Sequence, residues 1–110
     1  MLSNGLFRTR QKEEKERQIH VMHQKRSYWE SRIGNVVAEI EKFKLDEYIL
    51  KQAEEGRKGR TNTEFILSNE ELDELRTHHA TTNLVALKSK LEAAKKELDV
   101  VHGTLENLNA

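Results

Sequence analysis

Histidine is the residue type in this sequence best suited to metal binding, because the chain has five histidines and no cysteine. His20 and His23 are three residues apart, which places both on one face of a helix. A helical hairpin would bring His102 close to them, and three imidazoles can bind zinc. However, no aspartate or glutamate is clearly placed as a fourth ligand. We therefore expect no metal or other cofactor. If a metal does bind, the candidate ligands are His20, His23 and His102.

A short basic segment is the candidate site for an anion. Arg57, Lys58 and Arg60 follow one another without an acidic residue between them, and such cations can contact nucleic-acid phosphate. The segment lacks the spacing of a phosphate-binding P-loop. A solvated connector, or a patch that pairs with an acidic partner, is the alternative interpretation.

Catalytic chemistry has little support in the sequence. Ser31, Ser68 and Ser89 lie in helical or capping contexts without an evident base. The adjacent His78 and His79 project about 100° apart on a helix, so they are poorly placed to share one ion. We interpret them as surface or seam residues, with a pH-sensitive contact as the alternative. We do not expect an enzyme.

Composition limits the class of protein. The chain has 110 residues, with 19 basic and 19 acidic side chains, no proline and 35% charged residues. Average soluble domains carry about 25% charged residues, so a thick core is not expected. No apolar run could span a bilayer, and the N-terminal order of apolar and basic residues is the reverse of a secretory signal. We expect an intracellular protein, cytoplasmic by default or within a virion or other large assembly, and not a secreted one.

The apolar residues of the first half repeat with a heptad period, which predicts a helix over 9–55 after a short lead at 1–8. Gly34 is the weak point of this helix, where a kink is the alternative. A second ladder occupies the second half. Together they predict a seam of Ile19, Met22, Trp29, Ile33, Val36, Ile40, Phe43, Leu50, Leu84, Leu87, Leu91, Ala94, Leu98 and Val101, with Arg26 and Glu47 as its polar members.

A break separates the two ladders. Gly56 is expected to end the first helix, and residues 56–68 are expected to form a basic loop with an apolar clip. Ser68 and Glu71 have the spacing of a capping box, so a second helix is predicted over 69–108. The apolar phase shifts between residues 76 and 83, which a stutter or local unwinding would accommodate.

These elements predict an all-α fold, an antiparallel two-helix hairpin or coiled coil forming one domain. A fold-back near residue 62 would set Phe43 against Ala80. Neighbouring registers and a domain-swapped dimer satisfy the same heptads.

A single seam buries little apolar surface against the entropy cost of ordering the chain, so we expect the hairpin to complete a helical bundle with another chain. Apolar side chains off the seam are the candidate partner-binding residues, although they could instead form a small closing core: Tyr28, Val37, Leu45, Tyr48, Ile49, Phe65 and Ile66. We expect a non-enzymatic structural or assembly subunit, as a homo-oligomer or part of a larger assembly. The alternatives are a small helical chaperone or adaptor with one client, and a nucleic-acid-associated protein.

The nucleic-acid alternative makes a direct prediction. Replacing Arg57, Lys58 and Arg60 by alanine should reduce retention on a heparin column. With fewer contacts to the polyanion, binding releases fewer counterions and is weaker. The salt concentration needed for elution measures this. Unchanged elution of the triple variant would rule out a phosphate role for the segment.

Overall fold

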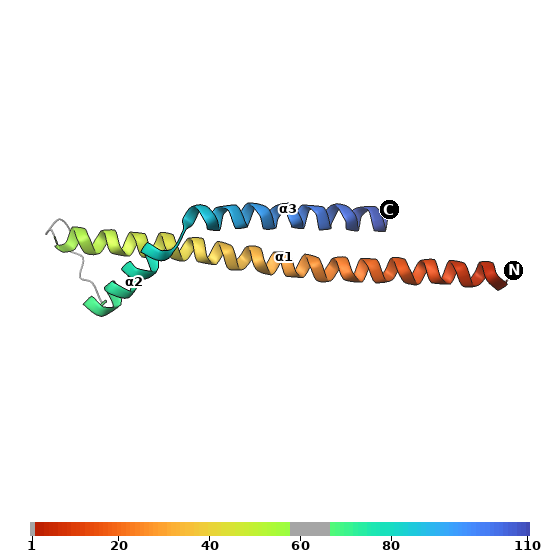
Figure 1. The fold of residues 1–110 in the computed structure, drawn as a ribbon, viewed down its shortest axis with the longest axis horizontal. Coiled ribbons are helices and arrows are strands. Elements are labelled where there is room, and N and C mark those ends of the chain that lie inside the picture. Colours follow the sequence, from red (N-terminus) through yellow and green to blue (C-terminus); the bar gives the residue numbers. More distant parts are fainter. Residues whose placement is uncertain (1, 58–66) are drawn as a thin grey trace. The chain divides into compact units, whose positions relative to one another are not determined.

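A computed structural model describes residues 2–57 and 67–110, with side chains described from 9 to 56 and from 67 onward. Within these ranges the chain forms three helices and no strand: α1 (Leu2–Arg57), α2 (Asn69–Thr81) and α3 (Leu84–Asn109), shown in Figure 1. The predicted all-α class is therefore confirmed. Over the same ranges, no helix is both long enough and apolar enough to cross a membrane.

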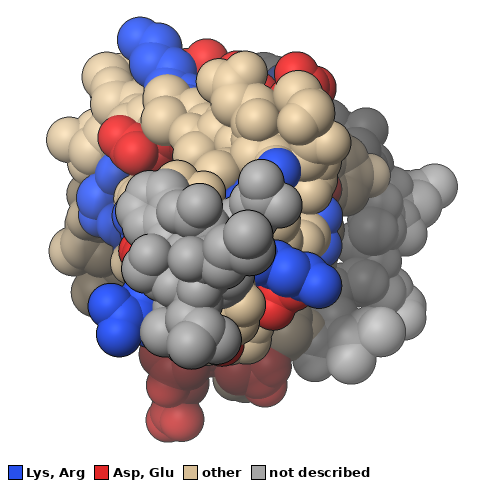
Figure 2. Space-filling model, turned by 90° about the vertical axis from the view of Figure 1, so that its right-hand side faces the viewer, with Lys and Arg blue, Asp and Glu red and all other residues tan. Residues whose placement is uncertain are grey.

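The chain divides into two compact units. The first, which we call the terminal unit, comprises Met1–Gly34 and Leu91–Ala110. Its parts of α1 and α3 lie side by side and run in opposite directions (Figure 1). Figure 2 views the molecule from the end at which α1 begins, and Lys, Arg, Asp and Glu side chains are all visible on the described part of that face. Among its described side chains, the buried apolar ones belong to α3: Ala94, Val101 and Leu105. Half-buried apolar residues of both helices accompany them: Ile19, Met22, Trp29 and Ile33 of α1, and Leu91, Leu98 and Leu108 of α3.

The second unit, which we call the central unit, comprises Asn35–Lys90. Phe43 is buried and stacks on His79 of α2. His79 directly precedes Ala80, the residue predicted to lie against Phe43. Leu50 and Leu84, both predicted seam residues, are half-buried. The unit's buried apolar side chains come from all three helices: Val36, Ile40, Phe43, Ala53, Leu72 and Leu87.

The start of α2 follows directly from its sequence. Ser68 has extended backbone angles (φ −72°, ψ 166°), and its Oγ accepts a hydrogen bond from the Glu71 amide at 3.2 Å. The Ser68 amide donates in return to Glu71 Oε1 at 3.5 Å. The predicted capping box is therefore present, and it satisfies amide groups that the first helical turn leaves without partners.

The structure corrects the single helix predicted over 69–108, because α2 ends at Thr81 and α3 begins at Leu84. Thr82 is extended (φ −84°, ψ 127°), and its amide donates to the His78 carbonyl at 3.1 Å. The Asn83 side chain accepts a hydrogen bond from the Ala86 amide at 3.0 Å. Threonine and asparagine have low helix propensity and bond readily to nearby backbone, so the expected phase shift becomes a complete break.

Two further boundaries differ from the sequence prediction. α1 begins at Leu2, so it includes the expected lead at 1–8, because no proline or competing cap stops it. It also continues through Gly56 to Arg57, since a glycine that keeps helical angles costs only about 1 kcal/mol. Gly34 lies inside α1 without interrupting it. The remaining loop residues, 58–66, lie outside the described part of the chain.

The capping box predicts opposite effects for two identical substitutions. Ser68→Ala should lower the free energy of unfolding by about 1 kcal/mol, because the Glu71 amide loses its acceptor. Ser89→Ala, at an exposed position within α3, should leave stability unchanged or raise it slightly, because alanine favours the helix. Urea unfolding followed by far-ultraviolet circular dichroism measures both. Equal losses would contradict a capping role for Ser68.

Candidate functional site

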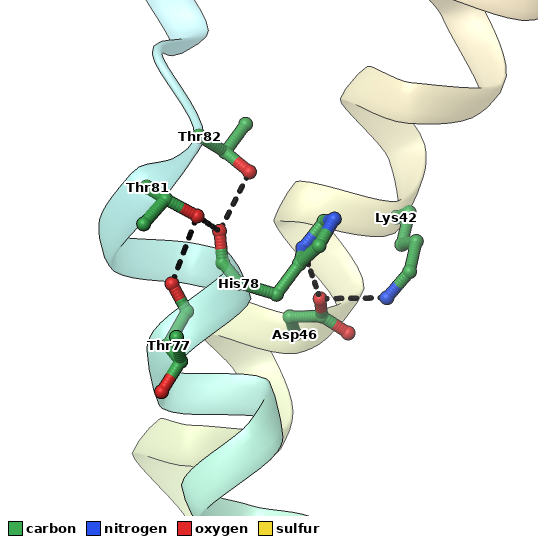
Figure 3. A network of polar contacts seen from close by, with 6 residues as sticks. All are labelled: Lys42, Asp46, Thr77, His78, Thr81 and Thr82. Atoms are coloured by element: carbon green, nitrogen blue, oxygen red, sulfur yellow. Dashed lines mark hydrogen bonds and ion pairs between the residues drawn. The ribbon is translucent and has the colours of Figure 1, made fainter.

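Among the described residues of the central unit, one charged side chain is buried: Asp46 of α1, which is only 3% exposed. Its Oδ2 accepts a hydrogen bond from Lys42 Nζ at 3.0 Å, and His78 Nδ1 of α2 lies 3.4 Å from the same oxygen. Lys42 precedes Asp46 by four residues, a spacing at which two side chains of one helix can meet. Figure 3 shows both contacts converging on Asp46 from the two helices. The carboxylate thus links α1 to α2, and the His78 contact is an ion pair whenever the imidazole is protonated.

The backbone of His78 is held by the hydroxyl-rich end of α2. Thr81 and Thr82 both donate side-chain hydrogen bonds to the His78 carbonyl, at 3.1 and 2.7 Å (Figure 3). Thr81 also donates to the Thr77 carbonyl at 3.0 Å. These bonds satisfy carbonyls that the last turn of a helix leaves free. They fix the end of α2 where His78 meets Asp46.

His79 contributes an aromatic contact to the same region. Its ring stacks on Phe43 with centroids 4.3 Å apart and an interplanar angle of 11°. Within the described part of the chain, its buried Nε2 has no hydrogen-bond partner. The adjacent histidines therefore make different contacts, one with a buried carboxylate and the other with a buried ring.

The hydroxyl groups of this cluster bond to backbone carbonyls. A carboxylate beside an imidazole also occurs in catalytic triads, where a hydroxyl lies within reach of the imidazole. Here the Thr81 and Thr82 hydroxyls donate to the backbone carbonyl of His78 instead. The contact between His78 and Asp46 joins α2 to α1.

A hollow of about 510 Å³ opens beside this cluster, and we call it the α1–α2 hollow. Its apolar lining comes from Ile49, Leu67 and Leu75, and its polar lining from Lys42, Glu71, Glu74 and His78. Leu45 and Tyr48, on the same stretch of α1, are 56% and 61% exposed. The hollow and these two side chains thus expose apolar atoms to solvent along one stretch of α1.

The structure places the other predicted partner-binding residues differently. Val37 is half-buried in the central unit, and Tyr28 is exposed in the terminal unit. Phe65 and Ile66 lie outside the described residues. Lys58, Arg60 and the side chain of Arg57 also lie outside them, so the anion-contact hypothesis stays a prediction.

The histidines proposed as metal ligands are only partly brought together. His23 and His102 line one hollow of the terminal unit, where Arg26 lies beside them, and His20 is not part of its lining. Throughout the described ranges, no three or more His, Cys, Asp or Glu side chains are grouped as a metal site would require.

Asp46 and its partners were missed by heptad counting. That pattern assigns Glu47 to the seam, whereas Glu47 is exposed and Asp46 is buried. The signal lies in the spacing, because Asp46 follows Phe43 by three residues and Lys42 by four. A carboxylate three residues beyond a core phenylalanine shares its face of the helix, and a lysine four residues before the carboxylate lies within reach of it.

Comparison of the chain with protein-family models, curated protein sequences and solved structures found no match. The fold and the site themselves define the class: an all-α protein with a helical-hairpin-like arrangement and a polar contact between α1 and α2.

The burial of Asp46 predicts that removing its partner Lys42 destabilises the protein more than neutralising Asp46 itself. Lys42→Met should lower the free energy of unfolding by about 1–2 kcal/mol, because a buried carboxylate loses a hydrogen-bond donor. Asp46→Asn should cost less, since Lys42 and His78 are half-exposed and can bind water instead. Lys44→Met is the control at an exposed position of the same helix. Equal urea-unfolding midpoints for the two methionine variants would contradict the role of Lys42.

Proposed function

We propose that this protein is a non-enzymatic structural or assembly subunit that binds other protein chains through its helical hairpin and the α1–α2 hollow. The observation that carries the proposal is the apolar lining of that hollow, together with the exposed Leu45 and Tyr48 on the same stretch of α1. Aromatic and aliphatic anchors of this kind supply most of the binding energy at protein interfaces.

The thin core supports the same function. The largest predicted seam residue of the terminal unit, Trp29, is only half-buried. Apolar burial stabilises by about 25 cal/mol per Å², whereas ordering each residue costs about 1–2 kcal/mol. A further helix packed on these faces would bury more apolar surface and complete a bundle.

The charges around the hollow indicate the chemistry of its partner. Lys42 already pairs with Asp46, and Glu71 already belongs to the capping box. Glu74 also lines the hollow and contributes a negative charge. We propose a partner segment, most simply a helix, that inserts an apolar side chain and presents a lysine or arginine toward Glu74.

The chaperone or adaptor alternative uses the same surface but differs in lifetime. A structural subunit stays bound through purification, whereas an adaptor releases its client readily and leaves a free chain. The dissociation rate of the isolated complex therefore separates the two functions.

Tyr48→Glu tests the proposed function, because it places a charge on the exposed apolar surface without disturbing a buried contact. The variant should remain helical. The amount of bound protein that copurifies with it from its native source should be at least about tenfold lower than with the wild type. Ser31→Glu is the matched control, since it adds the same charge at an exposed position of α1 in the terminal unit.

Quantitative mass spectrometry of affinity-purified wild type and both variants measures the effect. A protein lost with Tyr48→Glu and retained with Ser31→Glu supports docking at this surface. Identical recoveries for all three chains would overturn it.

A further inference from the structure

The terminal unit has an apolar surface of its own, which lies across α1 and α3. A hollow of about 420 Å³ is lined there by Lys25, Tyr28 and Trp29 of α1 and by Glu97, Val100 and Val101 of α3. Tyr28 from α1 is 58% exposed and Val100 from α3 is 64% exposed. Both helices therefore present an apolar side chain to solvent on one face of this unit.

Tyr28 is held in place by its neighbour. Its ring meets the half-buried Trp29 edge to face, with centroids 5.0 Å apart and an interplanar angle of 80°. A ring positioned in this way loses little conformational entropy when another surface covers it. Tyr28 thus has the properties of an interface anchor.

The same face carries one charge of each sign, on different helices. Lys25 belongs to α1 and Glu97 belongs to α3, and both line the hollow. In the described part of the chain, neither forms an ion pair, whereas Arg26 and Lys95 on the same two helices do. Each charge is therefore available to a group on a second surface.

We propose that this face binds a second copy of the same chain, with the two-fold axis parallel to the helices of the terminal unit. This rests on the proposed binding of protein chains and names the partner at this particular face. The axis places α1 of each copy opposite α3 of the other, so that Lys25 faces Glu97 across the interface twice. Tyr28 then packs against Val100 of the other copy, and four helices enclose one core.

The charges select this arrangement over its alternative. A two-fold axis perpendicular to the helices would put α1 on α1, bringing Lys25 against Lys25 and Glu97 against Glu97. Like charges brought together at an interface are unfavourable. The chain also has no formal net charge, so two copies approach without long-range repulsion.

Charge reversal tests the interface directly. Lys25→Glu and Glu97→Lys should each raise the dimer dissociation constant about tenfold, because each creates two like-charge contacts. The double variant should return to within about threefold of wild type, since the pairs are restored with exchanged signs. Tyr28→Ser should weaken the dimer by more than about thirtyfold. Lys96→Glu, exposed on α3, is the matched control and should change nothing.

Analytical ultracentrifugation over a hundredfold range of concentration measures these constants, with circular dichroism to verify that each variant remains helical. A carbodiimide cross-link between Lys25 and Glu97, made in a mixture of ¹⁵N-labelled and unlabelled chains, reports the pairing of helices. Peptides that join one labelled and one unlabelled segment are expected.

Several outcomes would overturn the inference: a monomer at every concentration, single variants that dimerise like wild type, a double variant that fails to recover, or no mixed-label peptide from the dimer. These outcomes are separate from the test at Tyr48. A monomer that loses its bound protein on Tyr48→Glu removes this interface alone. A dimer with identical recoveries for wild type and Tyr48→Glu removes the proposed function of the hollow alone.

Discussion

The break at Thr82 and Asn83 is the constraint on which the arrangement of the second half of the chain depends. The apolar residues Leu72 and Leu75 are out of phase with the leucine ladder that begins at Leu84. In one continuous helix, these two groups would point in different directions, and one would remain in water. Because Asn83 caps a new helix, each group takes its own orientation, and both Leu72 and Leu87 are buried. The loss of a few helical bonds is offset by this burial.

Asp46 shows how a charged group can be tolerated in so thin a core. A buried carboxylate without partners would cost several kcal/mol. Here one oxygen receives both Lys42 and His78, and the side chains of these partners remain about half-exposed. The carboxylate is therefore shielded from water while its counter-charges keep most of their hydration. Such a contact adds little net stability, but it favours the register in which His78 lies beside Asp46.

The sequence predicted the features that depend on local chemistry. The capping box at Ser68 and the all-α class follow from short-range spacing, which does not change when helices pack. The partners of Asp46 could not be predicted by heptad counting, because the pattern assumes one uniform phase along each helix. Where α2 contacts α1, the buried residue after Phe43 is Asp46, not the Glu47 that a uniform phase predicts. The heptad pattern shows a phase shift after residue 76, which either a stutter or a break in the helix could produce. The break forms because Asn83 caps a new helix in place of continued helical hydrogen bonds.

The two exposed apolar surfaces suit different partners because their charges are placed differently. Around the α1–α2 hollow, Lys42 is paired with Asp46, which leaves the negative charges of Glu71 and Glu74 at the surface. A second copy would bring a second Glu74 with it, so this surface favours a basic partner of another kind. On the terminal unit, Lys25 and Glu97 have opposite signs and belong to different helices. A two-fold axis parallel to the helices brings these opposite charges together across the interface, as a self-complementary surface requires.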